Sequence, residues 1–159
     1  MIVKEPQPDD IPDLAALWHA GWHEAHASIV PQALVAERVL SSFADRLCPA
    51  LDRTRMAVIA DRPAGLCIIK GTEIDQLYVS LQARGTGIAQ DLLKDGEERL
   101  RRAGVSTARL ACAPGNDRAA RFYRKCGWHL AERSLSLLEI PSGRFKLDVD
   151  WFEKALTAT

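Results

Sequence analysis

The chain contains the segment Gln82-Ala83-Arg84-Gly85-Thr86-Gly87-Ile88-Ala89, which joins a strand-like run to an amphipathic helix. The run before it, residues 73–80, is rich in apolar and β-favouring side chains, and residues 88–103 after it repeat apolar side chains at helical spacing. A turn with two glycines that opens directly into a helix can direct several backbone N–H groups toward one point, where the positive end of the helix favours an anion. The segment therefore predicts a phosphate-binding site.

Two common nucleotide-binding patterns do not fit this segment. A dinucleotide site has the pattern G-x-G-x-x-G, but Gln90 stands three residues after Gly87, and no acidic partner for a ribose follows on a strand. A triphosphate loop ends in Gly-Lys-Ser/Thr, whereas Gly87 is followed by Ile88. The predicted phosphate ligand is therefore of another kind.

Length and composition limit the classes of protein that fit. With 159 residues the chain can bury a core without disulfides or a metal, and we expect one domain over residues 1–159. Lysine plus arginine and aspartate plus glutamate number 21 each, so we expect no nucleic-acid partner. The cysteines lack C-x-x-C spacing, the N-terminus lacks a secretory apolar core, and no apolar run is long enough for a bilayer. We expect a cytoplasmic protein with reduced thiols and no membrane partner.

Apolar periodicity predicts an α/β domain that mixes helices with a strand meander. No repeat or linker divides the chain. The expected strands lie at 2–5, 56–60, 66–70, 73–80, 107–113, 128–140 and 145–152, and the expected helices lie at 11–29, 32–47, 88–103 and 116–127.

A second motif lies at Asn116-Asp117-Arg118-Ala119-Ala120-Arg121-Phe122-Tyr123-Arg124-Lys125-Cys126-Gly127-Trp128. It resembles the pattern N-x-x-A-x-x-F-Y-x-x-x-G-F of the GNAT superfamily of acyl-CoA N-acyltransferases, with Trp128 in place of the last Phe. The Q-x-x-G-x-G pattern of residues 82–87, preceded by Glu-Ile-Asp-Gln-Leu-Tyr-Val-Ser, resembles the pyrophosphate loop of the same superfamily. Two motifs in the family's order make the resemblance specific over residues 55–128.

The resemblance implies a GNAT fold with a mixed, mostly antiparallel sheet of about seven strands flanked by helices, and acetyl-CoA as the acyl donor without a metal. In this fold a bulge splays the strand at 73–80 from the next strand and frees backbone groups that a ladder would otherwise use. Asn116 either faces the pantetheine arm or only caps its helix. The implied cofactor-binding residues are Leu77, Tyr78 and Val79 for the pantetheine, Gln82, Arg84, Gly85, Thr86, Gly87, Ile88 and Ala89 for the pyrophosphate, and Asn116 and Tyr123.

Acyl transfer to an amine needs a neutral nucleophile, a donor to the thioester oxygen, and a proton for the departing thiolate. The resemblance assigns the proton to Tyr123, whose phenol is protonated at neutral pH, although a tyrosine that only packs beside Phe122 is the alternative. An N–H at or next to Val79 would stabilise the oxygen. Glu73 matches the family's glutamate and is the predicted general base, with an exposed strand-start residue as the alternative; Asp75 should face the same side.

We therefore expect an N-acetyltransferase that moves an acetyl group from acetyl-CoA directly to a primary amine, with a small molecule as the favoured acceptor. Acetylation of a protein or peptide and a non-catalytic acyl-CoA sensor are the alternatives, and a homodimer is left open. His19, His23 and His26 share one stripe of the first helix. A zinc triad, a cleft wall and a half-exposed surface are the three interpretations of that stripe.

Overall fold

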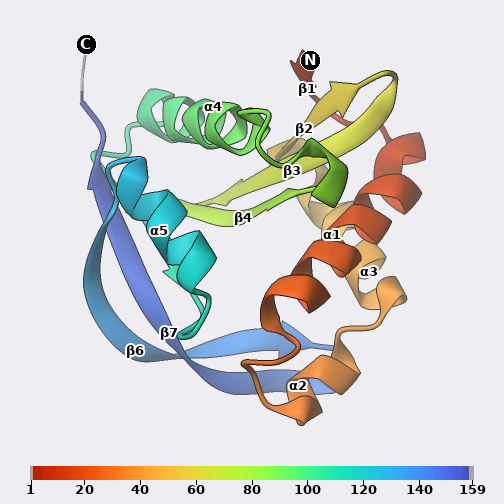
Figure 1. Cartoon of the computed structure of the whole chain (residues 1–159), viewed down its shortest axis with the longest axis vertical. Helices are drawn as coiled ribbons and strands as arrows, with labels where there is room; N and C mark the ends of the chain where they lie inside the picture. Colours follow the sequence, from red (N-terminus) through yellow and green to blue (C-terminus); the bar gives the residue numbers. More distant parts are fainter. Residues whose placement is uncertain (1, 158–159) are drawn as a thin grey trace.

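A seven-stranded sheet with the order β1-β2-β3-β4-β5-β7-β6 runs through the computed structural model, which describes residues 2–157 (Figure 1). Neighbouring strands are antiparallel except β4 and β5, which are parallel. The expected α/β domain with a mixed, mostly antiparallel sheet is confirmed. The strands are β1 (Ile2–Lys4), β2 (Thr54–Ile59), β3 (Arg62–Lys70), β4 (Glu73–Val79), β5 (Thr107–Cys112), β6 (His129–Ile140) and β7 (Gly143–Ala155).

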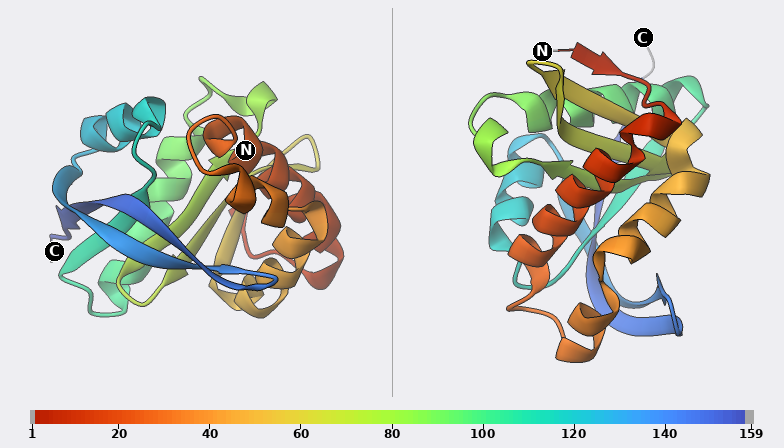
Figure 2. Two further views of the ribbon diagram at one scale, coloured as in Figure 1. Left: turned by 90° about the horizontal axis from the view of Figure 1, so that it is seen from below. Right: turned by 90° about the vertical axis from the view of Figure 1, so that its right-hand side faces the viewer.

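Helices cover both faces of the sheet, with α1 and α3 on one face and α4 and α5 on the other (Figure 2). Within residues 2–157, no helix is long and apolar enough to span a membrane. Short 3₁₀ turns lie at Pro8–Asp10, Leu51–Arg53 and Leu81–Ala83. The α-helices are α1 (Ile11–His26), α2 (Gln32–Glu37), α3 (Leu40–Ala50), α4 (Ile88–Arg102) and α5 (Asp117–Lys125).

Each face of the sheet has its own apolar core. Strand β3 contributes to both, because Ile68 packs with the residues of α1 and α3, whereas Cys67 packs with those of α4. Helix α1 approaches the sheet closely at Gly21, where an added Cβ would lie 2.8 Å from Cδ1 of Tyr78. The glycine that weakens the middle of α1 is therefore explained by the ring of Tyr78 beneath it.

Strand β4 contains the bulge that the family resemblance implies. Gln76 and Ile74 pair with consecutive residues of β3, so Asp75 between them has no partner across the ladder. The extra residue turns Asp75 and Gln76 to the same side of the sheet, where both line a cavity beside α1 and α3.

The segment expected to form one helix over residues 32–47 forms two, so that expectation is wrong. The chain leaves the helical conformation at Arg38 and is extended at Val39. Arg38 turns inward, is 2% exposed, and donates through Nη1 to the carbonyl of Glu139 on β6 at 2.6 Å. This long-range contact interrupts the helix, and a helical period in the sequence does not encode it.

The β6–β7 hairpin is longer than expected and reaches across to α2 (Figure 1). Ser142 in its turn donates a hydrogen bond to Glu37 at the end of α2. The hairpin thereby forms a wall opposite α2 and α3.

Candidate functional site

The parallel strands β4 and β5 separate after their first residues. Their ladder contains one pair, Glu73 with Arg109. At the other end of β4, the N–H of Ser80 donates to β3 at 2.8 Å. Because successive residues of a strand direct their backbone groups to opposite edges, the N–H and C=O groups of Leu77 and Val79 face the gap between β4 and β5.

Tyr78 differs from these two neighbours in the predicted pantetheine segment. Its backbone pairs with Leu66 of β3, and its ring packs against Gly21 of α1. Leu77 and Val79 therefore offer backbone groups to the gap, whereas Tyr78 offers its side chain to the cavity on the α1 face.

The glycine loop between β4 and α4 has the backbone conformation that the sequence predicts. Gly85 and Gly87 have φ angles of +76° and +85°, a region that residues with side chains rarely adopt. An added Cβ at either position would meet no atom within 4 Å, so the space in front of both glycines is open. Gly87 caps α4, and the first bond of the helix runs from Asp91 to the carbonyl of Gly87 at 3.1 Å. The N–H groups of Ile88 and Ala89 precede this bond and are available to an anion.

The other loop residues hold the turn in place. The hydroxyl of Thr86 donates to a carbonyl within the loop, and Gln82 is exposed on the 3₁₀ turn. Arg84 donates through Nη1 to Oε1 of Glu24 on α1 at 2.6 Å, which lowers the pKa of that carboxyl, and Arg118 of α5 lies 3.8 Å from the same group. Arg84 therefore ties the loop to α1 with its side chain.

Helix α5 carries the second motif on the β5 side of the gap. Oδ1 of Asn116 accepts a hydrogen bond from the N–H of Ala119 at 3.4 Å, as the capping alternative predicts. Trp128, which departs from the family's Phe, is 2% exposed, and its indole N–H donates to Glu97 of α4 at 3.2 Å. Glu97 also binds Lys154 of β7 at 2.7 Å, so the aromatic position is fixed to two other elements.

Tyr123 lies half-buried among aromatic rings, with ring centroids 5.4 to 6.4 Å from those of Phe122, Trp128 and Phe152. Burial raises the pKa of its phenol, and Cys112 of β5 and Tyr78 of β4 raise it further. Tyr123 packs against the apolar core on the α4 and α5 face of the sheet. A phenol with a raised pKa gives its proton only to a strong base, and a thiolate formed in the same low-dielectric surroundings is such a base.

Two buried thiols are unreactive at neutral pH. Burial raises the pKa of Cys67 to about 12 and that of Cys112 to about 11. Because the thiolate is the nucleophilic form, neither cysteine is prepared to form an acyl-enzyme.

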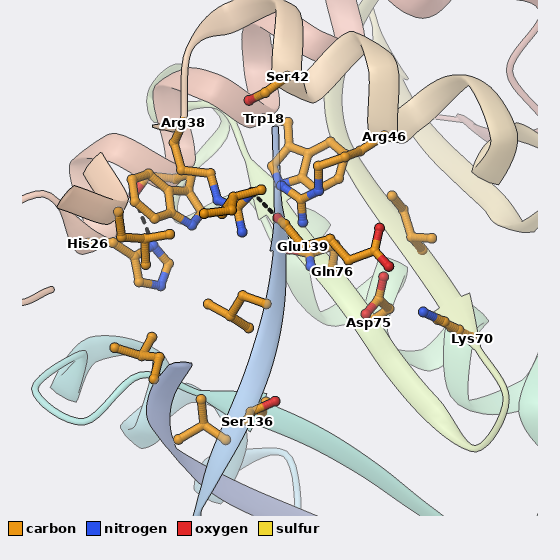
Figure 3. Close-up of a pocket in the computed structure, with 18 of the residues that line it drawn as sticks. Trp18, His26, Arg38, Ser42, Arg46, Lys70, Asp75, Gln76, Ser136 and Glu139 are labelled. Atoms are coloured by element: carbon orange, nitrogen blue, oxygen red, sulfur yellow. Dashed lines mark hydrogen bonds between the residues drawn. The ribbon is translucent and has the colours of Figure 1, made fainter. Parts of the chain in front are cut away.

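A cavity of about 780 Å³ lies on the α1 and α3 face, beside β4 (Figure 3). Its walls come from α1, α2, α3, β4 and the β6–β7 hairpin. Glu73 lines the cavity, whereas Tyr123, Asn116 and the glycine loop do not. The structure thus places the two predicted catalytic side chains on different sides of the β4–β5 gap.

Glu73 and Asp75 both line this cavity, on the same side of β4 as expected. Burial raises the pKa of Glu73, and the charge of Asp75 raises it further, while Lys70 and Arg109 oppose the shift. Burial also raises the pKa of Asp75. Two neighbouring carboxylates with raised pKa values are stronger bases than exposed carboxylates, which makes the pair a candidate proton acceptor.

The sequence analysis did not identify two arginines of the cavity, Arg38 and Arg46 (Figure 3). Arg46 lies over the ring of Trp18 on α1, with Cζ 4.4 Å from the ring centroid. One signal was available, because Arg46 stands three residues after Phe43 and four before Ala50, both of which are buried. A charged residue within an apolar helical stripe indicates a charged side chain that faces the interior of the protein.

The histidine stripe contributes to the cavity through one member, His26, whose Nδ1 bonds the carbonyl of Trp22 at 2.9 Å. His23 donates through Nε2 to the carbonyl of Arg38 at 2.6 Å, and His19 packs against Phe43. The rings of His19 and His23 also pack against each other, with centroids 4.5 Å apart, and those of His23 and His26 both pack against Trp22. Across residues 2–157, no group of three or more His, Cys, Asp or Glu side chains is arranged to hold a metal ion.

Comparisons with known proteins agree with this geometry. Residues 50–128 match the profile of the acetyltransferase (GNAT) family. This match covers both sequence motifs and the split between β4 and β5. The chain belongs to the GNAT family of acetyltransferases.

Solved structures with low sequence identity share the fold. A GCN5-related N-acetyltransferase from Rhodopseudomonas palustris has a TM-score of 0.76 at 23% identity, covering 98% of this chain and 95% of that one. Ribosomal-protein-alanine N-acetyltransferase from Brucella melitensis has a TM-score of 0.74 at 19% identity, covering 98% and 100%. YncA from Salmonella typhimurium, solved with its cofactor acetyl-CoA, has a TM-score of 0.73 at 14% identity, covering 100% and 95%. Comparison with curated protein sequences finds no significant match.

Proposed function

We propose that this protein transfers the acetyl group of acetyl-CoA directly to a primary amine of a small molecule held in the cavity. The observation that carries the proposal is the gap between β4 and β5, which is flanked by the backbone groups of Leu77 and Val79 and lies between the glycine loop and the cavity. Pantetheine in the gap and pyrophosphate at the N-terminus of α4 would place the thioester next to an amine in the cavity.

The transfer is one displacement through a tetrahedral intermediate. The neutral amine attacks the thioester carbonyl, a C–N bond forms, the C–S bond breaks, and the departing sulfur takes a proton. Glu73 receives the first proton from the ammonium, directly or through water, and releases it to solvent, and Tyr123 donates a proton to the departing sulfur. After the C–N bond has formed, the nitrogen loses its second excess proton, which returns through water to the phenolate of Tyr123. The N–H of Val79 stabilises the oxyanion, a contribution of roughly 10²- to 10³-fold in rate for donors of this kind.

The shape of the cavity supports a small acceptor over a protein chain. The β6–β7 hairpin faces α2 and α3 across it and is joined to them by the Arg38–Glu139 and Ser142–Glu37 hydrogen bonds. The Brucella melitensis relative acts, by its name, on an alanine of a ribosomal protein, so the fold alone does not exclude a protein acceptor. Retention of both Glu73 and Tyr123 supports catalysis over an acyl-CoA sensor.

A thiol-release assay with acetyl-CoA and a panel of polyamines, amino acids, aminoglycosides and peptides tests the proposal. We expect turnover with a small amine, and we expect Tyr123→Phe to lower kcat about 10²-fold while leaving acetyl-CoA affinity nearly intact, because the ring packing is preserved and the proton donor is lost. Turnover with none of the amines would favour the sensor. Unchanged kcat in Tyr123→Phe would remove that residue from the mechanism.

A further inference from the structure

Arg38 and Arg46 reach the cavity from the α2–α3 segment without a carboxylate partner. Within residues 2–157, neither guanidinium forms an ion pair at 4 Å or less. Arg38 is 2% exposed, and its Nε is buried without a hydrogen-bond partner. The Nη1 of Arg46 is also buried without one. Two guanidinium groups that line the cavity therefore have buried N–H groups without a partner, which a ligand could satisfy.

Contacts within the protein use only some of the N–H donors of Arg38 and offset only part of the cost of burying Arg46. Arg38 uses one N–H to bond the carbonyl of Glu139, and a guanidinium has five. The contact of Arg46 with the ring of Trp18 offsets only part of the free energy that burying a charge costs. Burial and the neighbouring charge of Arg46 lower the pKa of Arg38 to about 10, although Tyr78 and Glu37 oppose the shift. Burial also lowers the pKa of Arg46, against the charges of Asp75 and Glu139, so the carboxylates near the pair do not offset its burial.

The glycine loop does not explain the arginine pair either. The loop residues do not line this cavity, so the phosphates of acetyl-CoA would bind elsewhere. The acidic side chains of the cavity, Asp45, Glu73, Asp75 and Glu139, form no ion pair at 4 Å or less with the two arginines in the described part of the chain. In Figure 3 the two guanidinium groups project from the α2–α3 side toward the space in front of Asp75 and Gln76.

We infer that the acceptor carries a carboxylate as well as its amine, and that Arg38 and Arg46 bind this carboxylate. The inference rests on the proposed acetyl transfer and names the class of its acceptor: amino acids and related carboxylate-bearing amines. The planar forks of two arginines match a carboxylate, and the acidic pair Glu73 and Asp75 in the same cavity suits the acceptor's ammonium group. A phosphate dianion fits less well, because it would bring a second negative charge near Asp75 and Glu139.

The test compares each L-amino acid with its α-amide in the thiol-release assay, using acetyl-CoA as donor. The amide keeps the side chain and has the less basic amine, so intrinsic reactivity at neutral pH favours the amide. We expect the wild-type kcat/KM of the best amino acid to exceed that of its amide by about 10²-fold, since the amide leaves both arginines unpaired. Equal or better turnover of the amide would overturn the inference.

Variants at Arg46 test whether this arginine causes the preference for the amino acid over its amide. Arg46→Gln should remove the preference for the amino acid over its amide, mainly by raising KM for the amino acid. Arg46→Lys should restore part of the preference, because it restores the positive charge without the bidentate geometry of a guanidinium. Arg102→Gln is the matched control: this arginine lies at the exposed end of α4, and its loss should leave the preference unchanged. A preference that survives in Arg46→Gln would overturn the assignment.

Two binding measurements separate the inference from the proposed function. Thermal stabilisation by acetyl-CoA, measured on every variant, reports the donor site alone, and its absence in the wild type would contradict the proposed function. Calorimetric titration of N-acetyl amino acids in the presence of CoA reports the carboxylate site without turnover. We expect binding by the wild type and loss in Arg46→Gln. No binding by the wild type, or a preference for aminoalkyl phosphates in the thiol-release assay, would overturn the inferred carboxylate site and leave the proposed acetyl transfer standing.

Discussion

At the residue scale, the proposed chemistry of the cavity depends on the charge of Glu73. Burial and Asp75 raise the pKa of this carboxyl, so it ionises at higher pH than an exposed glutamate. A raised pKa makes the carboxylate a stronger base toward an ammonium than an exposed glutamate. It also means that folding favours the protonated form, a stabilisation that is complete below the unfolded-state pKa and is lost as pH rises through the folded-state pKa.

Glu73→Gln tests the consequence for catalysis and the consequence for folding stability separately. The wild-type kcat/KM should rise with pH through the raised pKa of Glu73, and the variant should lose this rising limb and have a lower plateau. Thermal stability at neutral pH should not fall in the variant, because Gln removes a half-buried charge that opposes folding. A pH–rate profile like that of the wild type would assign deprotonation to another group.

At the element scale, the glycine loop and its helix could be predicted from the sequence because their signals are local. Positive φ at Gly85 and Gly87 and the apolar stripe of α4 follow from residue type and spacing. The break between α2 and α3 could not be predicted, since Arg38 leaves the helix for a contact with Glu139, 101 residues away in the chain. The inward position of Arg38 could not be predicted for the same reason, whereas Arg46 lies within an apolar helical stripe that the sequence shows.

Gly87→Ala tests the loop as an anion site. At φ of +85° the new side chain should destabilise the fold by about 1 to 2 kcal/mol and occupy the open space before the helix. We expect acetyl-CoA affinity to fall at least about tenfold, measured by calorimetry. Gly71→Ala is the matched control, because this glycine of the β3–β4 turn has φ of +58° and also meets no atom within 4 Å of an added Cβ.

The control variant should lose similar stability and keep its affinity for acetyl-CoA. If Gly87→Ala and Gly71→Ala bind the cofactor equally well, the backbone of the loop does not hold the pyrophosphate.

At the scale of the whole molecule, the sheet separates two sites with different tasks. The α4 and α5 face carries the glycine loop and Tyr123, and the α1 and α3 face carries the cavity with Glu73 and the arginines. In the proposed function, the gap between β4 and β5 is where the thioester of acetyl-CoA would meet the amine in the cavity. The sequence motifs lie on or beside the donor side, which explains why the donor could be predicted from the sequence and the acceptor side could not.

The measurement that tests this account most directly is thermal unfolding of the wild-type protein with and without acetyl-CoA. Acetyl-CoA at a hundred times its dissociation constant should raise the free energy of unfolding by about 2.7 kcal/mol through mass action, and CoA alone should also stabilise the fold. An unfolding transition that neither acetyl-CoA nor CoA shifts at millimolar concentration would contradict the account.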